Sequence, residues 1–418
     1  MASIIIKGGR PLAGTVRVGG AKNSALKLMA AALLAPGESL IRNVPDISDV
    51  AVMAQVLERL GAQVTREDHC LRIDAGDVAS MEAPYELVAQ MRASIIVLGP
   101  LLARFGHARV AMPGGCNIGS RKIDMHIHGL QHLGVQIDFE HGYIEASAPR
   151  GLTGAHVILD FPSVGATENL LMAAVTASGT TVIDNAAREP EISDLVDMLR
   201  SMGAQIEGKG SPSLTITGVR TLRPAQHTTI GDRIEAGTLL AAGAMTGGRV
   251  TVTGFDPHHL EIVLTKMAEA GCEFDLAQDG ASVSRRGGLR AVDIATLPFP
   301  GFPTDMQAQF MALMSIADGS CVITENVFES RFMFADELKR MGADIDIEGH
   351  RAIVRGVPRL EGAPVRCPDL RGGAALVIAG LAAEGETRAD DVHHIMRGYE
   401  DLAGELQSLG ADVRIAED

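Results

Sequence analysis

A single cysteine with two cations close behind it is the residue of this sequence best suited to covalent or acid–base chemistry. Cys116 lies in the stretch MPGGCNIGSRK, among three glycines and shortly before Arg121 and Lys122. A nearby positive charge favours the thiolate, and some exposure admits a substrate, whereas a structural cysteine prefers buried apolar surroundings. We therefore predict that Cys116 is reactive, and that Cys272 and Cys321, in strand-like or helix-like stretches, are buried.

Three further stretches place polar groups where a turn leads into a helix. GGAKNSAL offers Lys22 and Asn23 after two glycines, although it is neither a Walker motif nor a dinucleotide-binding motif. FPGFPTDMQAQF offers Asp305 after a proline-rich turn, either as a helix N-cap or as a general base for a substrate hydroxyl. DFPSVGATENL predicts a glycine-containing turn whose backbone contacts a ligand.

Three histidines in DMHIHGLQHLG are the strongest candidates for a metal site. His126, His128 and His132 have spacings that one helix accommodates, but no carboxylate or thiolate partner is evident. The five cysteines are odd in number and widely spaced, and no CxxC pair occurs. We therefore expect neither a metal nor a cofactor.

Composition limits the classes of function open to the chain. It has 418 residues, a net charge of −15, 3% aromatic residues and no tryptophan, which disfavours general nucleic-acid binding and base stacking. No secretory signal is visible, and no run approaches the roughly 20 apolar residues of a membrane span. We expect a cytoplasmic, reduced protein that does not insert into membranes, and the sequence leaves its oligomeric state open.

The elements that must position these residues belong to an internal repeat of about 70 residues. An apolar–Gly–small pattern recurs six times, as in RLGAQV and SMGAQI, and a helix-stopping glycine precedes each copy. The glycines of the pattern are Gly61, Gly134, Gly203, Gly271, Gly342 and Gly410. The helix-stopping glycines are Gly37, Gly106, Gly179, Gly247, Gly319 and Gly385.

Each unit of the repeat predicts the order βαβαββ in an α/β fold. Its first helix, such as SALKLMAAALLA, is apolar on all sides and should be buried, whereas the second, such as ISDLVDMLRSMG, is amphipathic. The chain ends one strand short of its sixth unit, and residues 1 to about 20 resemble the missing ending. We therefore predict a three-unit domain over residues 21–229 and another over residues 1–20 and 230–418, with central helices and the active site in the cleft between the domains.

The repeat also aligns polar residues at equivalent positions. Fourteen residues before the helix-stopping glycines lie Asn23, Arg92, Gly165, Arg233, Asp305 and Arg371. Twelve residues after them lie Asp49, Glu191, His259, Arg331 and Arg397, with the second unit out of register. Helix starts present free N–H groups that favour anions, although many polar helix starts are simply solvated. Because several of these residues are arginines at matching positions, we predict a ligand with phosphate and carboxylate groups.

The second unit departs from the period at the candidate cysteine. Its marker glycines, Gly106 and Gly134, are 28 residues apart, against 23 to 25 in the other units. The extra residues fall in PGGCNIGSRK. Cys116 is therefore expected on a loop added to the scaffold, where function is commonly located.

Over essentially its whole length the chain resembles the UDP-N-acetylglucosamine enolpyruvyl transferase family. The resemblance rests on GGAKNSAL, PGGCNIGSRKID, SVGAT, NAAREPEI, DRIEAGT, FPTDMQAQF, FESRF, DLRGGAAL and RGYEDL. It implies a two-domain inside-out α/β barrel of the enolpyruvyl transferase type. It also implies a transferase of peptidoglycan synthesis, and hence of cell-wall biogenesis, cell shape and cell division, that is a fosfomycin target.

The resemblance implies a specific reaction between two small molecules. The enolpyruvyl group of phosphoenolpyruvate passes to the 3′-hydroxyl of UDP-N-acetylglucosamine through a tetrahedral ketal, and phosphate leaves. Cys116 matches the family's general acid, Asp305 the base for the 3′-hydroxyl, and Lys22, Arg121 and Arg397 the residues that hold phosphoenolpyruvate. Matches to other substrate contacts are Asn23, Arg92, Arg121, Lys122, Ile123, Asp124, Met125, Ser163, Val164, Gly165, Asp305, Val327, Arg331 and Arg371.

Two departures and two alternatives accompany the resemblance. Phe161 stands where some members carry a lysine that reaches the nucleotide, and Lys122 stands where proline is frequent. A shikimate 3-phosphate enolpyruvyl transferase is the alternative within the same fold, but that family lacks the cysteine loop. A non-catalytic paralogue that binds the nucleotide sugar is the other alternative, which the presence of Cys116 and Asp305 disfavours.

Overall fold

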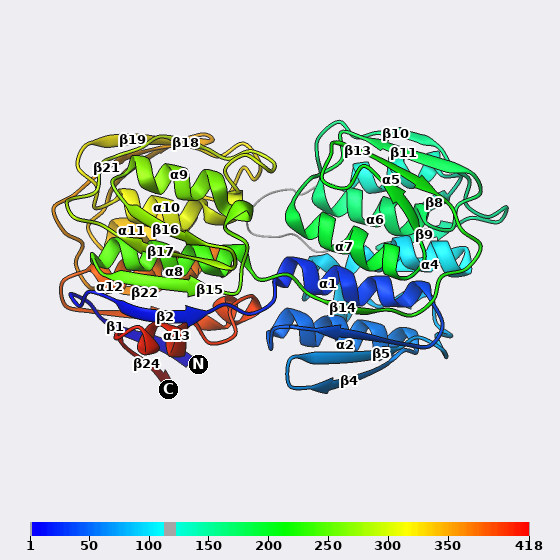
Figure 1. Ribbon diagram of the computed structural model, residues 1–418, viewed down its shortest axis with the longest axis horizontal. Helices are drawn as coiled ribbons and strands as arrows, with labels where there is room; N and C mark the ends of the chain where they lie inside the picture. Colours follow the sequence, from blue (N-terminus) through cyan, green and yellow to red (C-terminus); the bar gives the residue numbers. More distant parts are fainter. Residues whose placement is uncertain (1, 113–122, 418) are drawn as a thin grey trace. The chain divides into compact units, whose positions relative to one another are not determined.

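The computed structural model describes residues 2–112 and 123–417, which form two compact units (Figure 1). One unit lies within residues 20–230, and the other combines residues 2–19 with residues 231–417. The chain therefore passes between the units twice, at Gly19–Gly20 and at Ile230–Gly231.

Within the described residues, the six sheets share one topology. In each sheet the first two strands are parallel, the third pairs antiparallel with the second, and the fourth pairs antiparallel with the third. A βαβ crossover followed by a hairpin produces this order. The six predicted βαβαββ units are therefore present.

The sheets of the unit within residues 20–230 are, in spatial order, β14 (Gln226–Thr228), β3 (Glu38–Arg42), β5 (Cys70–Asp74) and β4 (Gln63–Glu67); β6 (Glu82–Ala83), β7 (His107–Ala111), β9 (Tyr143–Ser147) and β8 (Gln136–Glu140); β10 (His156–Ile158), β11 (Thr180–Asp184), β13 (Ser213–Thr217) and β12 (Gln205–Glu207). Its helices are α1 (Lys22–Ala31), η1 (Ala32–Leu34), α2 (Ser48–Leu60), α3 (Tyr85–Val88), η2 (Arg92–Val97), α4 (Leu98–Phe105), α5 (Asp124–His132), α6 (Val164–Ala174) and α7 (Pro190–Ser201).

The sheets of the other unit are β2 (Ala13–Arg17), β15 (Arg249–Thr253), β17 (Gly280–Ser284) and β16 (Glu273–Ala277); β18 (Ile294–Ala295), β19 (Ser320–Thr324), β21 (Arg351–Arg355) and β20 (Asp344–Glu348); β22 (Pro364–Arg366), β23 (Glu386–Asp390), β1 (Ala2–Lys7) and β24 (Asp412–Glu417). Its helices are α8 (Arg233–Thr246), η3 (Pro257–Leu260), α9 (Glu261–Glu269), η4 (Thr304–Met306), α10 (Gln307–Met314), α11 (Ala335–Arg340), α12 (Leu370–Ala382), η5 (Val392–Arg397) and α13 (Leu402–Ser408).

The N-terminal residues divide between two sheets. β1 lies between β23 and β24 and so completes the sixth unit, as predicted. The expectation that the following residues also belong to the sixth unit is wrong, because β2 pairs in parallel with β15 and opens the fourth unit. The reason is that every βαβ unit needs a first strand. β14 supplies it to β3 at the end of the other unit in the same way.

The glycines that define the repeat have a common backbone conformation. All twelve have φ between +68° and +107°, a region that L-residues other than glycine adopt only at a cost. They end helices or follow them directly, so the regular spacing in the sequence reports the regular spacing of helix ends.

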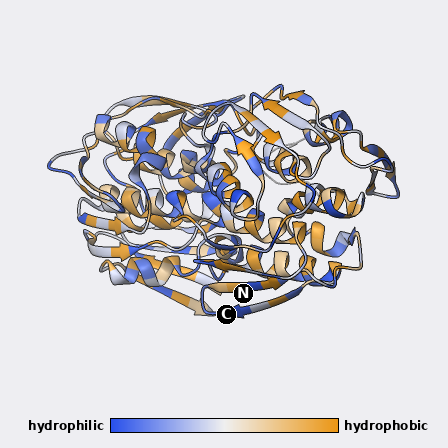
Figure 2. Ribbon diagram, turned by 45° about the vertical axis from the view of Figure 1, so that its right-hand side comes forward, coloured by the Kyte–Doolittle hydropathy of each residue, from blue (hydrophilic) through white to orange (hydrophobic). Residues whose placement is uncertain are grey.

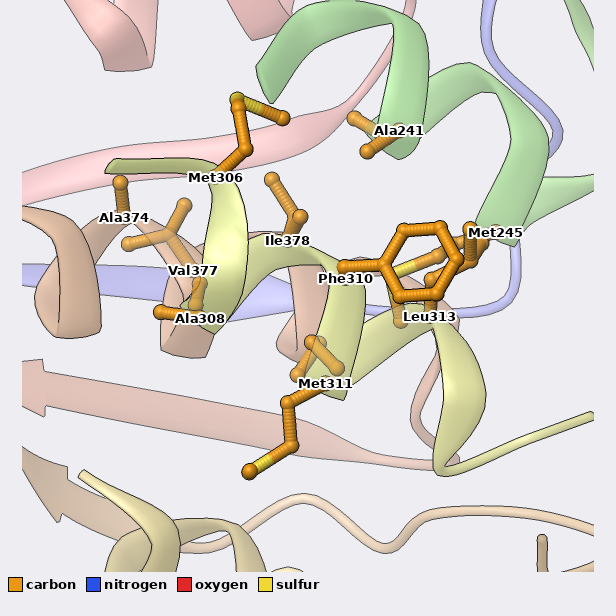
Figure 3. Packing of buried hydrophobic residues seen from close by; sticks show 14 of the residues in the cluster. Ala241, Met245, Met306, Ala308, Phe310, Met311, Leu313, Ala374, Val377 and Ile378 are labelled. Carbon is orange, nitrogen blue, oxygen red and sulfur yellow. The ribbon is translucent and has the colours of Figure 1, made fainter. Parts of the chain in front are cut away.

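The apolar helices form the core of each unit. α4 packs against α6, and α12 packs against both α8 and α10. All residues of α10 are buried, as are those of α12 from Arg371 to Leu381. Figure 2 shows hydrophobic residues along these helices, and Figure 3 shows Met245, Phe310 and Ile378 of three helices packed together. The prediction of central buried helices is therefore confirmed.

None of the helices in residues 2–112 and 123–417 has both the length and the hydropathy that a membrane span requires.

Candidate active site

The Asp305 carboxylate is held between two buried arginines. Asp305 is the second residue of η4, Arg331 Nη2 donates to its Oδ1 at 2.7 Å, and Arg371 Nη2 donates to its Oδ2 at 3.2 Å. The side chains of the arginines are 5% and 3% exposed, whereas that of Asp305 is 24% exposed. Two charge-assisted bonds favour the ionised carboxylate. Asp305 is therefore an anchored, partly exposed hydrogen-bond acceptor.

This geometry decides between the two interpretations of Asp305 that the sequence allows. Pro303, and not Asp305, occupies the N-cap of η4. The N-cap interpretation is therefore wrong, because the two arginines bind the carboxylate oxygens instead.

The backbone at the start of α12 fixes Arg371. Asp369 caps this helix, and its Oδ1 accepts hydrogen bonds from Arg371 N at 2.9 Å and Gly372 N at 3.1 Å. Burial by itself lowers the pKa of the Arg371 guanidinium, but Tyr399, Asp305 and Asp232 raise it above the ordinary value. Arg371 is therefore a permanent cation.

A buried hydrogen-bond network supports Arg371 from below. Its guanidinium carbon lies 5.4 Å from the centroid of the Tyr399 ring. The Tyr399 hydroxyl lies 2.8 Å from Thr238 Oγ1, and Gln309 Nε2 donates to that threonine oxygen at 2.9 Å. Burial raises the pKa of Tyr399, so its hydroxyl stays protonated. The network ties α8, α10 and the segment after η5 to one arginine.

The remaining candidates of this unit lie on neighbouring segments. Arg397 ends η5, is half-buried and lies two residues before Tyr399. Val327 lies in the turn after β19, where its N–H donates to Glu325 Oε1 at 2.8 Å. Arg233 begins α8, is buried, and lies 5.9 Å from the centroid of the Phe299 ring.

In the unit within residues 20–230, Lys22 forms a largely buried ion pair. It begins α1, and its Nζ lies 2.8 Å from Asp49 Oδ2 at the start of α2. The two side chains are 11% and 5% exposed. Asn23 follows on α1, and its carbonyl accepts a hydrogen bond from Lys27 Nζ at 2.8 Å. Asp49 therefore holds the ammonium that sequence counting had selected.

The start of α6 packs against a buried histidine. Ser163 is the N-cap of α6, and its Oγ accepts a hydrogen bond from Ala166 N at 3.3 Å. A Cβ on Gly165 would lie 3.1 Å from the ring of His126, which explains why the position has no side chain. Asn169 Nδ2 lies 2.9 Å from His126 Nδ1. Burial, together with the charge of Arg92, lowers the pKa of His126 to about 4, so the ring is neutral at pH 7.

The segment around the candidate cysteine is described only in part. Cys116, Arg121 and Lys122 lie outside the described residues. Ile123 is the N-cap of α5, and Asp124 begins this helix as an exposed residue followed by half-buried Met125. Arg92 begins η2.

The histidines and the described cysteines have the surroundings of structural residues. His126 is buried, whereas His128 and His132 are exposed, so the three rings do not meet. In the described part of the chain, no group of three or more potential ligands is placed to bind a metal ion. Cys272 and Cys321 are buried, as predicted, and burial raises the pKa of their thiols to about 11 and about 12.

Sequence reasoning missed several residues that organise the site. Glu325, Thr304 and Tyr399 were assigned no role, although Tyr399 lies in the quoted motif RGYEDL. Its burial was open to prediction, since the chain has three tyrosines and a tyrosine after an apolar turn commonly packs inside. No local signal marks Glu325, whose partners lie up to 29 residues away.

Comparisons with known proteins agree with this geometry. Residues 6–406 match the family model EPSP synthase (3-phosphoshikimate 1-carboxyvinyltransferase). The UDP-N-acetylglucosamine 1-carboxyvinyltransferase of Trichlorobacter lovleyi is 51% identical, with 99% of both chains covered, and that of Mycobacterium leprae is 54% identical, with 98% of both covered. The chain belongs to the UDP-N-acetylglucosamine 1-carboxyvinyltransferase family.

Solved structures extend the likeness of this carboxyvinyltransferase family member to three dimensions. The enolpyruvyl transferase NikO from Streptomyces tendae is similar with a TM-score of 0.90 and 29% identity over 99% of both chains. An EPSP synthase from Acinetobacter baumannii has a TM-score of 0.77 and 19% identity over both entire chains, a likeness of fold. The predicted enolpyruvyl transferase fold is thus confirmed.

Proposed function

We propose that this chain transfers the enolpyruvyl group of phosphoenolpyruvate to the 3′-hydroxyl of UDP-N-acetylglucosamine and releases phosphate. The observation that carries the proposal is full-length identity of 51% to 54% with relatives named for this activity. The Asp305 cluster supports it, because a base and two arginines in one place suit a reaction that deprotonates a hydroxyl and expels phosphate. The product serves peptidoglycan synthesis, and we propose that the enzyme acts in the cytoplasm, where both substrates are made.

The proposed chemistry is an addition followed by an elimination. In the addition, the thiol of Cys116 donates a proton to C3 of phosphoenolpyruvate, the 3′-oxygen of the sugar bonds to C2, and Asp305 receives the hydroxyl proton. The result is a tetrahedral ketal that still carries the phosphate. In the elimination, C3 loses a proton, the C2–C3 double bond forms again, and phosphate leaves C2 with the electrons of the C–O bond.

The contacts of Asp305 suit the role of base. A carboxylate that two arginines hold in place has a fixed orientation, which shortens the search for the reactive geometry. The arginines keep it ionised and therefore able to accept a proton, at the cost of lower intrinsic basicity. The same cations stabilise negative charge that develops on the leaving phosphate. Position and charge, more than basicity, thus define the contribution of Asp305.

We assign the anionic and nucleotide parts of the substrates to different side chains. Lys22, Arg121 and Arg397 hold phosphoenolpyruvate, and Arg331 and Arg371 serve the phosphate. The residues proposed to contact the nucleotide sugar are Asn23, Arg92, Arg121, Lys122, Ile123, Asp124, Met125, Ser163, Val164, Gly165, Asp305 and Val327. Exposed Phe161 carries no charge for the diphosphate, so the arginines must supply it.

Turnover with two acceptors tests the proposal against its rival within the fold. Phosphate release from phosphoenolpyruvate is measured with UDP-N-acetylglucosamine and, separately, with shikimate 3-phosphate. We expect release with the first alone. Release with shikimate 3-phosphate alone would replace the proposed acceptor.

A cysteine variant tests catalysis against simple binding. We expect Cys116→Ala to lower kcat by at least about 100-fold, the usual scale for loss of a general acid, while UDP-N-acetylglucosamine still binds in calorimetry. Intact mass after incubation with phosphoenolpyruvate should show an adduct on the parent protein and none on the variant. Binding without any turnover by the parent protein would instead favour a non-catalytic paralogue.

A further inference from the structure

A fully engaged carboxylate lies one residue away from the candidate base. Glu325 ends the segment after β19 and is 2% exposed. Its Oε1 accepts hydrogen bonds from Thr296 Oγ1 at 2.8 Å, Val327 N at 2.8 Å and Phe328 N at 3.0 Å, and its Oε2 accepts one from Thr304 Oγ1 at 2.9 Å. A buried carboxylate with four donors is a fixed point of the structure.

The bond to Thr304 gives Glu325 a connection to the base. The Thr304 hydroxyl donates its proton to Glu325, so its lone pairs are free to accept, and Arg331 Nη1 donates to the same oxygen at 3.1 Å. Arg331 Nη2 donates to Asp305 Oδ1 at 2.7 Å. The order is therefore Glu325, Thr304, Arg331, Asp305, and each donor in it faces an acceptor.

Few other contacts fix the direction of the Arg331 guanidinium. Its Nε has no hydrogen-bond partner within the described residues, so the two terminal nitrogens carry its polar contacts with Thr304 and Asp305. Its guanidinium carbon lies 5.5 Å from the centroid of the Phe328 ring. Phe328 is itself anchored by its N–H on Glu325. Both surroundings of the arginine thus lead back to one carboxylate.

We propose that Glu325 is a positioning residue for the reaction, which aims Arg331 at Asp305 through the Thr304 hydroxyl and fixes the turn that carries Val327. The inference rests on the proposed function, in which Asp305 accepts the proton of the sugar hydroxyl. Glu325 itself touches neither substrate in this scheme. Its effect reaches the reaction through the orientation of one guanidinium and one short turn.

Two threonines provide a matched test, because both donate to Glu325 and only Thr304 also contacts Arg331. We expect Thr304→Val to lower kcat roughly 10- to 100-fold, as for other small losses of alignment. With Arg331 less firmly held against Asp305, the acidic limb of the kcat profile should move to higher pH, since a nearby cation favours the ionised carboxylate. Thr304→Ser keeps the hydroxyl and should restore both values. Thr296→Val should lower Tm and leave the acidic limb in place.

Glu325→Gln provides a second variant and a test of the connection. It should lower kcat at least as much as Thr304→Val, and the double variant should be no worse than Glu325→Gln alone, because the two residues act in series. The variants are assayed for phosphate release with UDP-N-acetylglucosamine, and their thermal unfolding is followed by circular dichroism. If Thr304→Val is too unstable to assay, Glu325→Gln with its pH profile decides the question.

The outcomes separate this inference from the function on which it rests. If Thr304→Val and Glu325→Gln keep the parent kcat and acidic limb while Asp305→Ala loses turnover, the positioning role is overturned and the proposed function stands. An equal shift of the acidic limb in Thr296→Val would also overturn it, because the effect would then be structural. If the parent protein fails to turn over UDP-N-acetylglucosamine, the proposed function and this inference both fail.

Discussion

At the scale of single residues, the Asp305 cluster depends on charge balance. Two arginines with nearly no exposure would be costly to bury alone, and one shared carboxylate lowers that cost while it keeps some exposure for itself. The excess positive charge that remains suits an anionic ligand. The cluster is therefore most balanced when a phosphate or a carboxylate is bound beside it.

The described cysteines should differ from Cys116 in their reactivity. Burial raises the pKa of Cys272 to about 11 and that of Cys321 and Cys367 to about 12, and the thiolate is the form that alkylates. We expect iodoacetamide at pH 8 to leave these three cysteines unlabelled in the native protein, as measured by peptide mass spectrometry. Labelling in denaturant is the control, and rapid native labelling of any of the three would contradict the burial argument.

The sequence predicted these candidate residues unevenly, for physical reasons. Asp305, Arg331 and Arg371 were found by counting, because the repeat fixes where each helix begins, and the structure places the three together. The role of Glu325 was out of reach, since its bonds to Thr296 and Thr304 join separate segments and leave no periodic trace. The pairing of Lys22 with Asp49 was equally hidden, although both positions had been selected.

At the scale of elements, the repeat glycines predict a cost for any added side chain. Gly203 follows α7 with φ +107°, and a Cβ there would meet nothing within 4 Å. Gly203→Ala should therefore lower the free energy of unfolding by roughly 1–2 kcal/mol through backbone strain alone, as measured by urea denaturation. Gly287 also has open space around it but no left-handed backbone, so Gly287→Ala is the control and should cost less. Equal effects of the two variants would argue against strain.

The contact between α1 and α6 contains a carboxylate that titrates near neutral pH. Glu168 of α6 is fully buried, with Lys27 Nζ of α1 at 3.8 Å from its Oε2. Burial raises its pKa from 4.5 to about 8, although Lys27 acts in the opposite direction. Between these two values the native state keeps a proton that the unfolded chain has released, so this group makes stability fall as pH rises.

Replacement of Glu168 should remove that dependence. We expect Glu168→Gln to flatten the decline in unfolding free energy between pH 5 and pH 8, measured by urea denaturation at several pH values. Glu207→Gln alters an exposed residue and should leave the decline unchanged. A parent protein whose stability rises over this interval in the same way as that of Glu168→Gln would show that Glu168 is ionised when folded.

At the scale of the whole molecule, the order of strands in space differs from their order in the chain. β1 is an inner strand of its sheet although it begins the chain, and Ala2 pairs with Glu417 next to the C-terminus. The repeat predicted that the N-terminus completes the last unit, because the last unit lacks a strand. It did not predict that β2 joins another sheet, since two short strands separated by a turn appear in the sequence as one ending.

This arrangement makes the two units unequal when they are separated. Residues 20–230 contain all the strands of their own three sheets, whereas residues 231–418 lack β1 and β2. Loss of an inner strand leaves β23 and β24 with unpaired edges. We therefore expect the fragment 20–230 to unfold cooperatively on heating, and the fragment 231–418 to show no cooperative transition by circular dichroism. A chain in which residue 418 is joined by a short Gly/Ser linker to residues 1–19 should regain that transition, because Ala2 and Glu417 are already paired. A control that carries the same linker and a scrambled 1–19 segment should remain unfolded, and a cooperative transition in that control or in 231–418 alone would show that the N-terminal strands do not complete this unit.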